Sequence, residues 1–157
     1  MTRSTRFSYT VCFCAALLFL GASTSFLASL VTRITGNLNI TLSVFSGLVI
    51  LKSLTFSAGS FLLGSLRKWI SANKLIAGGL LLLPLLSFIY PRTKAVPVFA
   101  GALLMWGIAS ALIEGGADIR NGELPEDFAG QLNFLQYAAM SIGAIGGPVL
   151  LRSEERR

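Results

Sequence analysis

Histidine is absent from this chain of 157 residues, so the side chain most often used as a general base and metal ligand is missing. Cysteine is scarce: Cys12 and Cys14 lie two residues apart in an apolar block, a spacing that points them to different faces of a helix. They therefore do not form a metal-binding or redox pair. The sequence also has no phosphate-binding loop and no nucleophile elbow. We expect no catalytic residues, no metal site and no enzymatic activity.

Charged residues are also few. They make up 13% of the chain, whereas about 25% is usual in soluble domains. Hydrophobic residues make up 54%, and the mean hydropathy is +0.72. Such a chain cannot cover a soluble surface with polar groups, which indicates a multi-pass membrane protein. The net charge of +6 comes from short basic flanks of apolar blocks, where membrane anchoring and topology explain it better than nucleic-acid binding does.

Five apolar blocks are separated by short polar connections. They cover about residues 8–32, 42–63, 75–90, 95–118 and 130–151. A helix needs about 20 apolar residues to cross a bilayer, and the first block is longer than the roughly 7–15 residues of a signal-peptide core. We predict an all-α membrane fold in which residues 1–157 form one transmembrane domain, a bundle of about five helices.

The basic residues do not settle the orientation of this bundle by number alone. With five spans, equal numbers of lysine and arginine residues flank the helices on the two sides of the membrane. The first helix and the cluster of Arg67, Lys68 and Lys74 favour a cytoplasmic N-terminus. We therefore expect a protein of the plasma membrane whose N-terminus is cytoplasmic and whose C-terminal tail lies outside.

Three ionisable side chains lie inside or at the end of apolar blocks. Lys52 stands in the middle of the second block, and Glu114 and Asp118 lie four residues apart near the end of the fourth. Residues four apart share a helix face. A charged side chain at the bilayer centre costs about 2.5–3.5 kcal/mol or more, so it usually faces protein or a water-filled cavity. Lys52 thus has two possible roles. It takes part in gating or in contact with a solute, or it is the partner of a buried acid.

Small residues mark two faces on which helices can pack closely. Gly107, Ala111 and Gly115 recur every four residues in the fourth block, and Gly143 and Gly147 form a G-x-x-x-G pair in the fifth. Small residues at this spacing let a neighbouring backbone approach closely. We predict that both faces are helix–helix contacts.

Four short motifs follow one another in an order that is typical of a known family. They read GSLRK (64–68), LIEGGAD (112–118), NFLQ (133–136) and GAIGGP (143–148). Together they resemble the N-terminal half of a major facilitator superfamily transporter, in particular the fucose–galactose–glucose symporter branch. That branch contains bacterial fucose permease and animal sodium-dependent glucose transporters. The first motif resembles the G-x-L-x-D-x-x-G-R-K signature, with lysine in place of the aspartate and serine in place of the second glycine, as in that branch.

The resemblance implies roles for the polar residues. Glu114 would bind the coupling ion, Na+ or a proton, and its neutralisation would ease its movement through the closed state. Asp118, Asn133 and Gln136 would form hydrogen bonds to a sugar. Lys52 would be the counter-charge of Glu114 or a further contact for the sugar. In the alternative, Glu114 has no transport role and only pairs with Lys52 or with a basic residue at the interface.

Two hypotheses about function follow. In the first, the chain is a transporter, or part of one, that couples the movement of a monosaccharide such as glucose or fucose to a cation or proton. In the second, it is a truncated, non-transporting membrane protein that packs against a full-length relative through its glycine faces. The superfamily has twelve helices in two halves, so the first hypothesis implies a second half or a homologous partner. The other expected partners are the lipid bilayer and the sugar, without a cofactor beyond the coupling ion.

Overall fold

Six helices make up the part of the chain that the structure describes. The computed structural model describes the backbone of residues 3–155 and the side-chain environments of residues 6–146 and 148. The helices are α1 (Arg3–Ser29), α2 (Val31–Leu38), α3 (Leu42–Leu66), α4 (Ala72–Ile89), α5 (Val96–Asn121) and α6 (Glu126–Glu155). Residues 3–155 contain no strand, and α1, α3, α4 and α5 are long and apolar enough to cross a membrane. The predicted fold class, a helical membrane bundle, is confirmed.

The fifth predicted block lies within α6. This helix is 30 residues long, which corresponds to about 45 Å along its axis. It begins with acidic residues in its first turn, where carboxylates interact favourably with the helix dipole. Its length matches that of its neighbour α1, but its crossing of the membrane stays a prediction.

Helix α2 occupies a segment whose polar composition predicts a plain turn. That prediction is wrong, because Ile34 and Leu38 lie four residues apart and give the segment one buried apolar face. Asn39 ends the helix in the left-handed conformation, with φ 51° and ψ 45°. Thr41 then caps α3, since its hydroxyl accepts a hydrogen bond from the Val44 backbone N–H at 3.4 Å.

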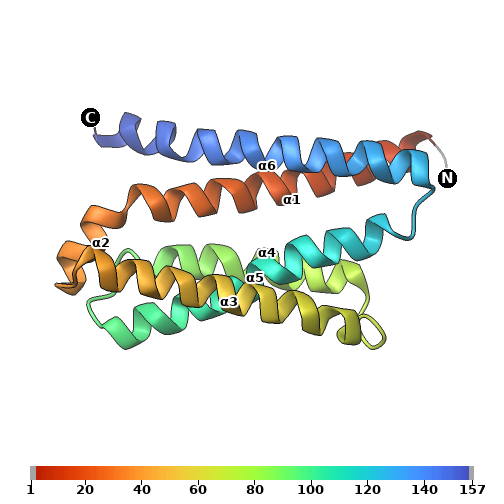
Figure 1. The fold of residues 1–157 in the computed structure, drawn as a ribbon. Coiled ribbons are helices and arrows are strands. Elements are labelled where there is room, and N and C mark those ends of the chain that lie inside the picture. The colour runs from red at the N-terminus through yellow and green to blue at the C-terminus, as the bar shows by residue number, and fades with distance from the viewer. Residues whose placement is uncertain (1–2, 156–157) are drawn as a thin grey trace.

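The helices form two groups in space. Helices α1 and α6 lie side by side and run in the same direction, whereas α3, α4 and α5 form the second group (Figure 1). Within the second group, α5 packs against both α3 and α4. The short helix α2 joins the groups at the end of the bundle where the C-terminus lies (Figure 1).

Helices α1 and α6 approach so closely that two positions have room only for glycine. A Cβ atom at Gly21 of α1 would lie 2.0 Å from the carbonyl oxygen of Met140, and one at Gly143 of α6 would lie 2.0 Å from that of Leu18. Gly143 therefore lies in a close helix contact, with Gly21 as the small residue on the other side. Gly147, the other predicted packing residue of α6, lies outside the residues whose side-chain environment is described.

The predicted small-residue face of α5 lies against α3. A Cβ atom at Gly107 would lie 2.5 Å from the backbone oxygen of Lys52, and one at Gly115 would lie 2.5 Å from the side chain of Leu63. Between them, Ala111 faces Gly59 of α3. These contacts increase together in residue number along both helices, so α3 and α5 run in the same direction, as Figure 1 also shows.

The opposite side of α5 packs against α4 through glycines that no spacing rule singled out. A Cβ atom at Gly79 of α4 would lie 2.7 Å from the carbonyl oxygen of Ala109. One at Gly116 of α5 would lie 2.7 Å from the side chain of Ile76. Helix α5 is therefore held from two sides, which fixes the direction in which its remaining side chains point.

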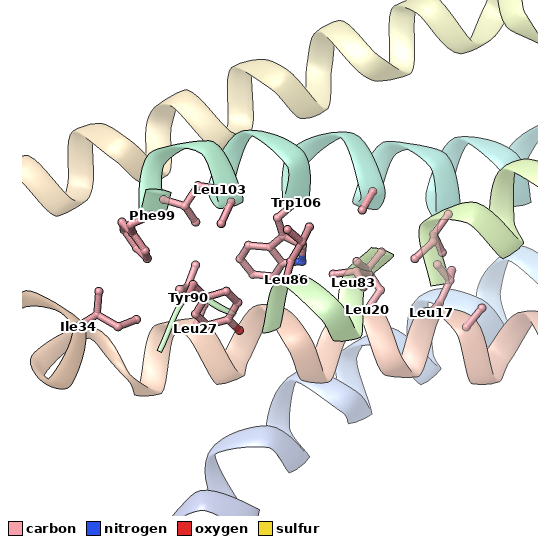
Figure 2. Packing of buried hydrophobic residues seen from close by; sticks show 14 of the residues in the cluster. Leu17, Leu20, Leu27, Ile34, Leu83, Leu86, Tyr90, Phe99, Leu103 and Trp106 are labelled. Atoms are coloured by element: carbon pink, nitrogen blue, oxygen red, sulfur yellow. The ribbon is translucent and has the colours of Figure 1, made fainter. Parts of the chain in front are cut away.

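A continuous apolar core connects the two groups of helices. Trp106 of α5 is fully buried and packs against Tyr90, with ring centroids 5.9 Å apart. Figure 2 shows the indole between α5 and α1, next to Leu86 of α4. The same core contains Leu20 and Leu27 of α1. The indole is thus held in place by side chains from three helices.

Replacement of Gly143 tests the close contact of α1 with α6. In Gly143→Ala the added methyl group meets the Leu18 backbone, so the helices must separate, and we expect a loss of stability of about 1–3 kcal/mol. The measurement is thermal unfolding of the purified protein in detergent. Gly146→Ala is the matched control, because a Cβ atom there meets nothing within 4 Å. Equal unfolding temperatures for the two variants would contradict the described contact.

Candidate functional site

A polar cavity lies among α1, α3, α5 and α6. Its volume is about 240 Å³, and residues from all four helices line it: Leu20, Thr24, Lys52, Ser53, Phe56, Ser57, Ser110, Glu114 and Met140. Six of these nine side chains are polar, and all six belong to helices that are apolar enough to cross a membrane. Hydrocarbon offers no hydrogen-bond partners, so polar side chains gathered at this depth are expected to serve water, an ion or a solute.

The cavity brings together two of the residues predicted from the sequence, Lys52 and Glu114. Direct pairing between them is not found, because the one ion pair among the described side chains joins Arg120 and Glu123. The Lys52 ammonium instead lies over the ring of Trp106, 4.2 Å from the centroid. Such a contact contributes about 0.5–1 kcal/mol when exposed and about 2 kcal/mol or more when desolvated. It therefore offsets a large part of the cost of placing lysine inside the membrane.

Four hydroxyl groups of the cavity are anchored to their own helices. The hydroxyls of Thr24, Ser53, Ser57 and Ser110 each donate to the backbone carbonyl four residues earlier, at 3.0, 3.2, 3.1 and 2.9 Å. Such a bond occupies the hydroxyl hydrogen and leaves an oxygen lone pair available as an acceptor. The cavity thus offers acceptors at fixed positions, together with one ammonium and one carboxylate.

Glu114 has a neighbour on α6 that sequence reasoning missed. The Tyr137 phenol of α6 lies near the Glu114 carboxylate, and Asp118 lies one helical turn beyond Glu114 on α5. Tyr137 follows Asn133 by four residues, so the two share a face of α6. This spacing was the signal that could have identified Tyr137 once Asn133 had been singled out.

The two acids of α5 open onto different cavities. Asp118 lines a second cavity, of about 420 Å³, where the connection between α3 and α4 meets the end of α5; Arg67, Asn73 and Arg120 are among its other lining residues. Glu114 does not line it. The spacing correctly indicates that the acids are neighbours, but one turn of helix separates a mid-bundle cavity from one at the bundle edge.

The predicted amide residues of α6 form a cluster with a residue of α5. The Asn121 side-chain N–H₂ donates to the Gln136 carbonyl oxygen at 2.8 Å and also to the Asn133 carbonyl oxygen. The Gln136 amide donates back to Asn121 at 3.4 Å. Asn121 and Gln136 are buried, and none of the three lines the Glu114 cavity. In this arrangement the amides tie α5 to α6 and are already hydrogen-bonded to one another.

At the edge of the bundle, cations and aromatic rings link α1 to the following helices. Arg120 forms hydrogen bonds to the Tyr9 hydroxyl of α1 and to Glu123. The Arg6 guanidinium lies over the ring of Phe128, 5.3 Å from its centroid. These contacts place charged groups where the helices end, in agreement with the usual position of arginine at membrane interfaces.

Comparison with family models, curated proteins and solved structures finds no match to this chain. The description of the candidate site therefore rests on the residues of this chain alone. Of the predicted solute contacts, Lys52 lies in the same cavity as Glu114, whereas Asp118, Asn133 and Gln136 do not line that cavity. The sequence did not single out Trp106, whose ring lies under the Lys52 ammonium, or Tyr137, which lies near Glu114.

Removal of Asn121 tests the amide cluster. Asn121→Ala leaves the buried Gln136 amide without its partner, and an unsatisfied buried polar group costs about 1–3 kcal/mol. We expect this loss in the free energy of unfolding, measured by denaturant titration in detergent micelles. Gln131→Ala, at an exposed position of α6, is the control and is expected to change stability by about 0.5 kcal/mol or less. The cluster has no structural role if both variants unfold at the same denaturant concentration.

Proposed function

We propose that this chain takes part in the coupled transport of a small hydroxylated solute, a monosaccharide such as glucose or fucose, driven by a cation or proton. The cavity that contains Lys52 and Glu114 carries this proposal, because it places two opposite charges and several hydroxyl acceptors inside membrane-spanning helices. Charged residues inside the membrane commonly mark ion and substrate pathways. The resemblance of four sequence motifs to sugar symporters of the major facilitator superfamily is a second, independent support.

Glu114 is the residue that would exchange the coupling ion. A carboxylate at this depth is costly while charged, and binding of a cation or proton neutralises it. Sugar hydroxyl groups both donate and accept hydrogen bonds, so they match a lining that combines hydroxyl oxygens with the Lys52 ammonium. Occupation of the cavity by ion and sugar together would then be less costly than occupation by either alone.

The position of the cavity between two groups of helices suits alternating access. The α1–α6 pair contributes Leu20, Thr24 and Met140, and the second group contributes the remaining lining residues. A change in the angle between the groups would open the cavity toward one side of the membrane or the other. Transporters commonly move one bundle against another around a site near the membrane centre.

An exposed face of α3 supports a second candidate function, that of a protein which packs with a full-length relative. This helix buries two side chains, Phe45 and Leu63. Its exposed residues include four serines on one face, Ser46, Ser53, Ser57 and Ser60, of which Ser53 and Ser57 also line the Glu114 cavity. A stripe of small polar residues is typical of helix contacts inside membranes. In this second proposal the glycine and serine faces act through packing, with or without transport.

Neutralisation of Glu114 tests the transport proposal. We expect Glu114→Gln in proteoliposomes to reduce ion-driven uptake of radiolabelled glucose or fucose by about tenfold or more, since the exchangeable charge is lost. Glu126→Gln, at an exposed position in the first turn of α6, is the control and should transport like the wild type.

Two outcomes decide between the candidate functions. If the wild type transports and Glu114→Gln is equally active, Glu114 is not the coupling site. If the wild-type chain shows no uptake, even with a co-expressed homologue, the transport proposal fails for this polypeptide and packing with a relative remains.

A further inference from the structure

The position of Lys52 is unusual for a lysine that shares a cavity with a carboxylate. Its ammonium lies on the Trp106 ring and not on Glu114, although both charged residues line the same space. Trp106 is fully buried and packed by Tyr90, so the aromatic surface that holds the ammonium is fixed. Lys52 thus has two possible partners, the Trp106 ring and the Glu114 carboxylate, and in this structure it contacts the ring.

The second possible partner is Glu114, which lines the same cavity as Lys52. The backbone of Lys52 meets α5 at Gly107, and Glu114 follows seven residues later, about 10.5 Å along the axis. Helical side chains lean toward the N-terminus of their own helix, so Glu114 leans toward the level of Lys52, while the first bond of the Lys52 side chain, on the parallel helix α3, leans away from Glu114. The Lys52 side chain has a flexible four-carbon stem, so it can turn back toward the C-terminal end of α3 and approach the carboxylate through the cavity that both residues line.

We propose, building on the proposed function, that Lys52 is a tethered cation which moves between the Trp106 ring and the Glu114 carboxylate, so that the site is coupled to a proton and not to Na+. The site has two states. When a proton from water binds the Glu114 carboxylate, the neutral acid releases the ammonium to the ring. When the proton returns to water on the other side, the ammonium moves to the carboxylate.

The charges of the cavity favour this assignment. Of its nine lining residues, Glu114 is the one acid and Lys52 the one base, so the deprotonated site is neutral without an added metal ion. A sodium ion would have to share the cavity with an ammonium and a single carboxylate. A lysine ammonium is a compact point charge, so it can itself occupy the place of a small cation.

The remaining groups around Glu114 do not supply a second cation. Helix α1 contributes the uncharged Thr24 and α6 contributes the Tyr137 phenol. On α5 itself, Asp118 adds a negative charge from the neighbouring cavity. Lys52 of α3 is therefore the positively charged side chain that shares the cavity with Glu114.

Labelling of Glu114 by a hydrophobic carbodiimide tests the exchange. This reagent reacts with protonated carboxyl groups, and mass spectrometry of the peptide that contains Glu114 reports the labelled fraction. The purified full chain is labelled over a range of pH in sodium chloride or in choline chloride. For the wild type we expect the same midpoint pH of labelling in both salts, because Na+ does not bind.

Variants of Lys52 separate the effect of charge from the effect of shape. Without the ammonium, the ionised Glu114 has no counter-charge, so Lys52→Met should move the labelling midpoint to higher pH by about one unit, a tenfold change in proton affinity. Lys52→Arg keeps the charge and should leave the midpoint close to the wild-type value. Trp106→Phe keeps an aromatic ring with a weaker attraction for cations and should move the midpoint to lower pH.

Two results would overturn the proposal. Protection of wild-type Glu114 by Na+ at constant pH would show a sodium site, and an unchanged midpoint in a folded Lys52→Met protein would show that the ammonium never reaches the acid. If Lys52→Met does not fold, Lys52→Gln replaces it, with Trp106→Phe as an independent variant. The labelling needs no sugar, so a chain that fails to transport can still pass or fail this test.

Discussion

The structure depends on the close approach of helix backbones at glycine residues. Gly21 and Gly143 bring α1 and α6 together, while glycines on both sides of α5 admit α3 and α4. Lipid tails are as apolar as leucine, so association in a membrane depends on this kind of packing more than on the hydrophobic effect. One consequence concerns function directly: the contact at Gly107 sets Lys52 at the level where its ammonium reaches the Trp106 ring.

Charged groups at the edge of the bundle have charged or polar partners, whereas those inside it are only partly compensated. At the edge, Arg120 has both Tyr9 and Glu123 as partners, so its charge is compensated in place. In the cavity, Lys52 rests on an aromatic ring and Glu114 is left with a tyrosine neighbour and no direct cation. An acid inside membrane spans that lacks a direct counter-charge can bind a proton, a cation or a solute, whereas an acid in an ion pair already has its partner. This difference is the physical basis of the transport proposal.

The sequence predicted the elements of this fold better than their arrangement. Long apolar runs and their flanks identified the four clearest spans, and spacing identified Gly107, Ala111 and Gly115 as one face of α5. The sequence did not reveal the apolar face of α2, because two buried residues in a polar segment of eight residues give only a weak periodic pattern. Cross-helix contacts were also out of reach: no local pattern shows that Asn121 meets Gln136, or that Trp106 lies under Lys52.

The central claim is that a polar cavity accessible to water lies among the helices around Glu114. The most direct measurement is the reactivity of single cysteines on α3 with a membrane-impermeant thiol reagent, in lipid bilayers and in a background without Cys12 and Cys14. Ser57 lines the cavity, whereas Leu54 is an exposed apolar residue on the same helix that does not line it. The account predicts rapid reaction of Ser57→Cys and little reaction of Leu54→Cys. The account would be contradicted if neither variant reacted with the reagent.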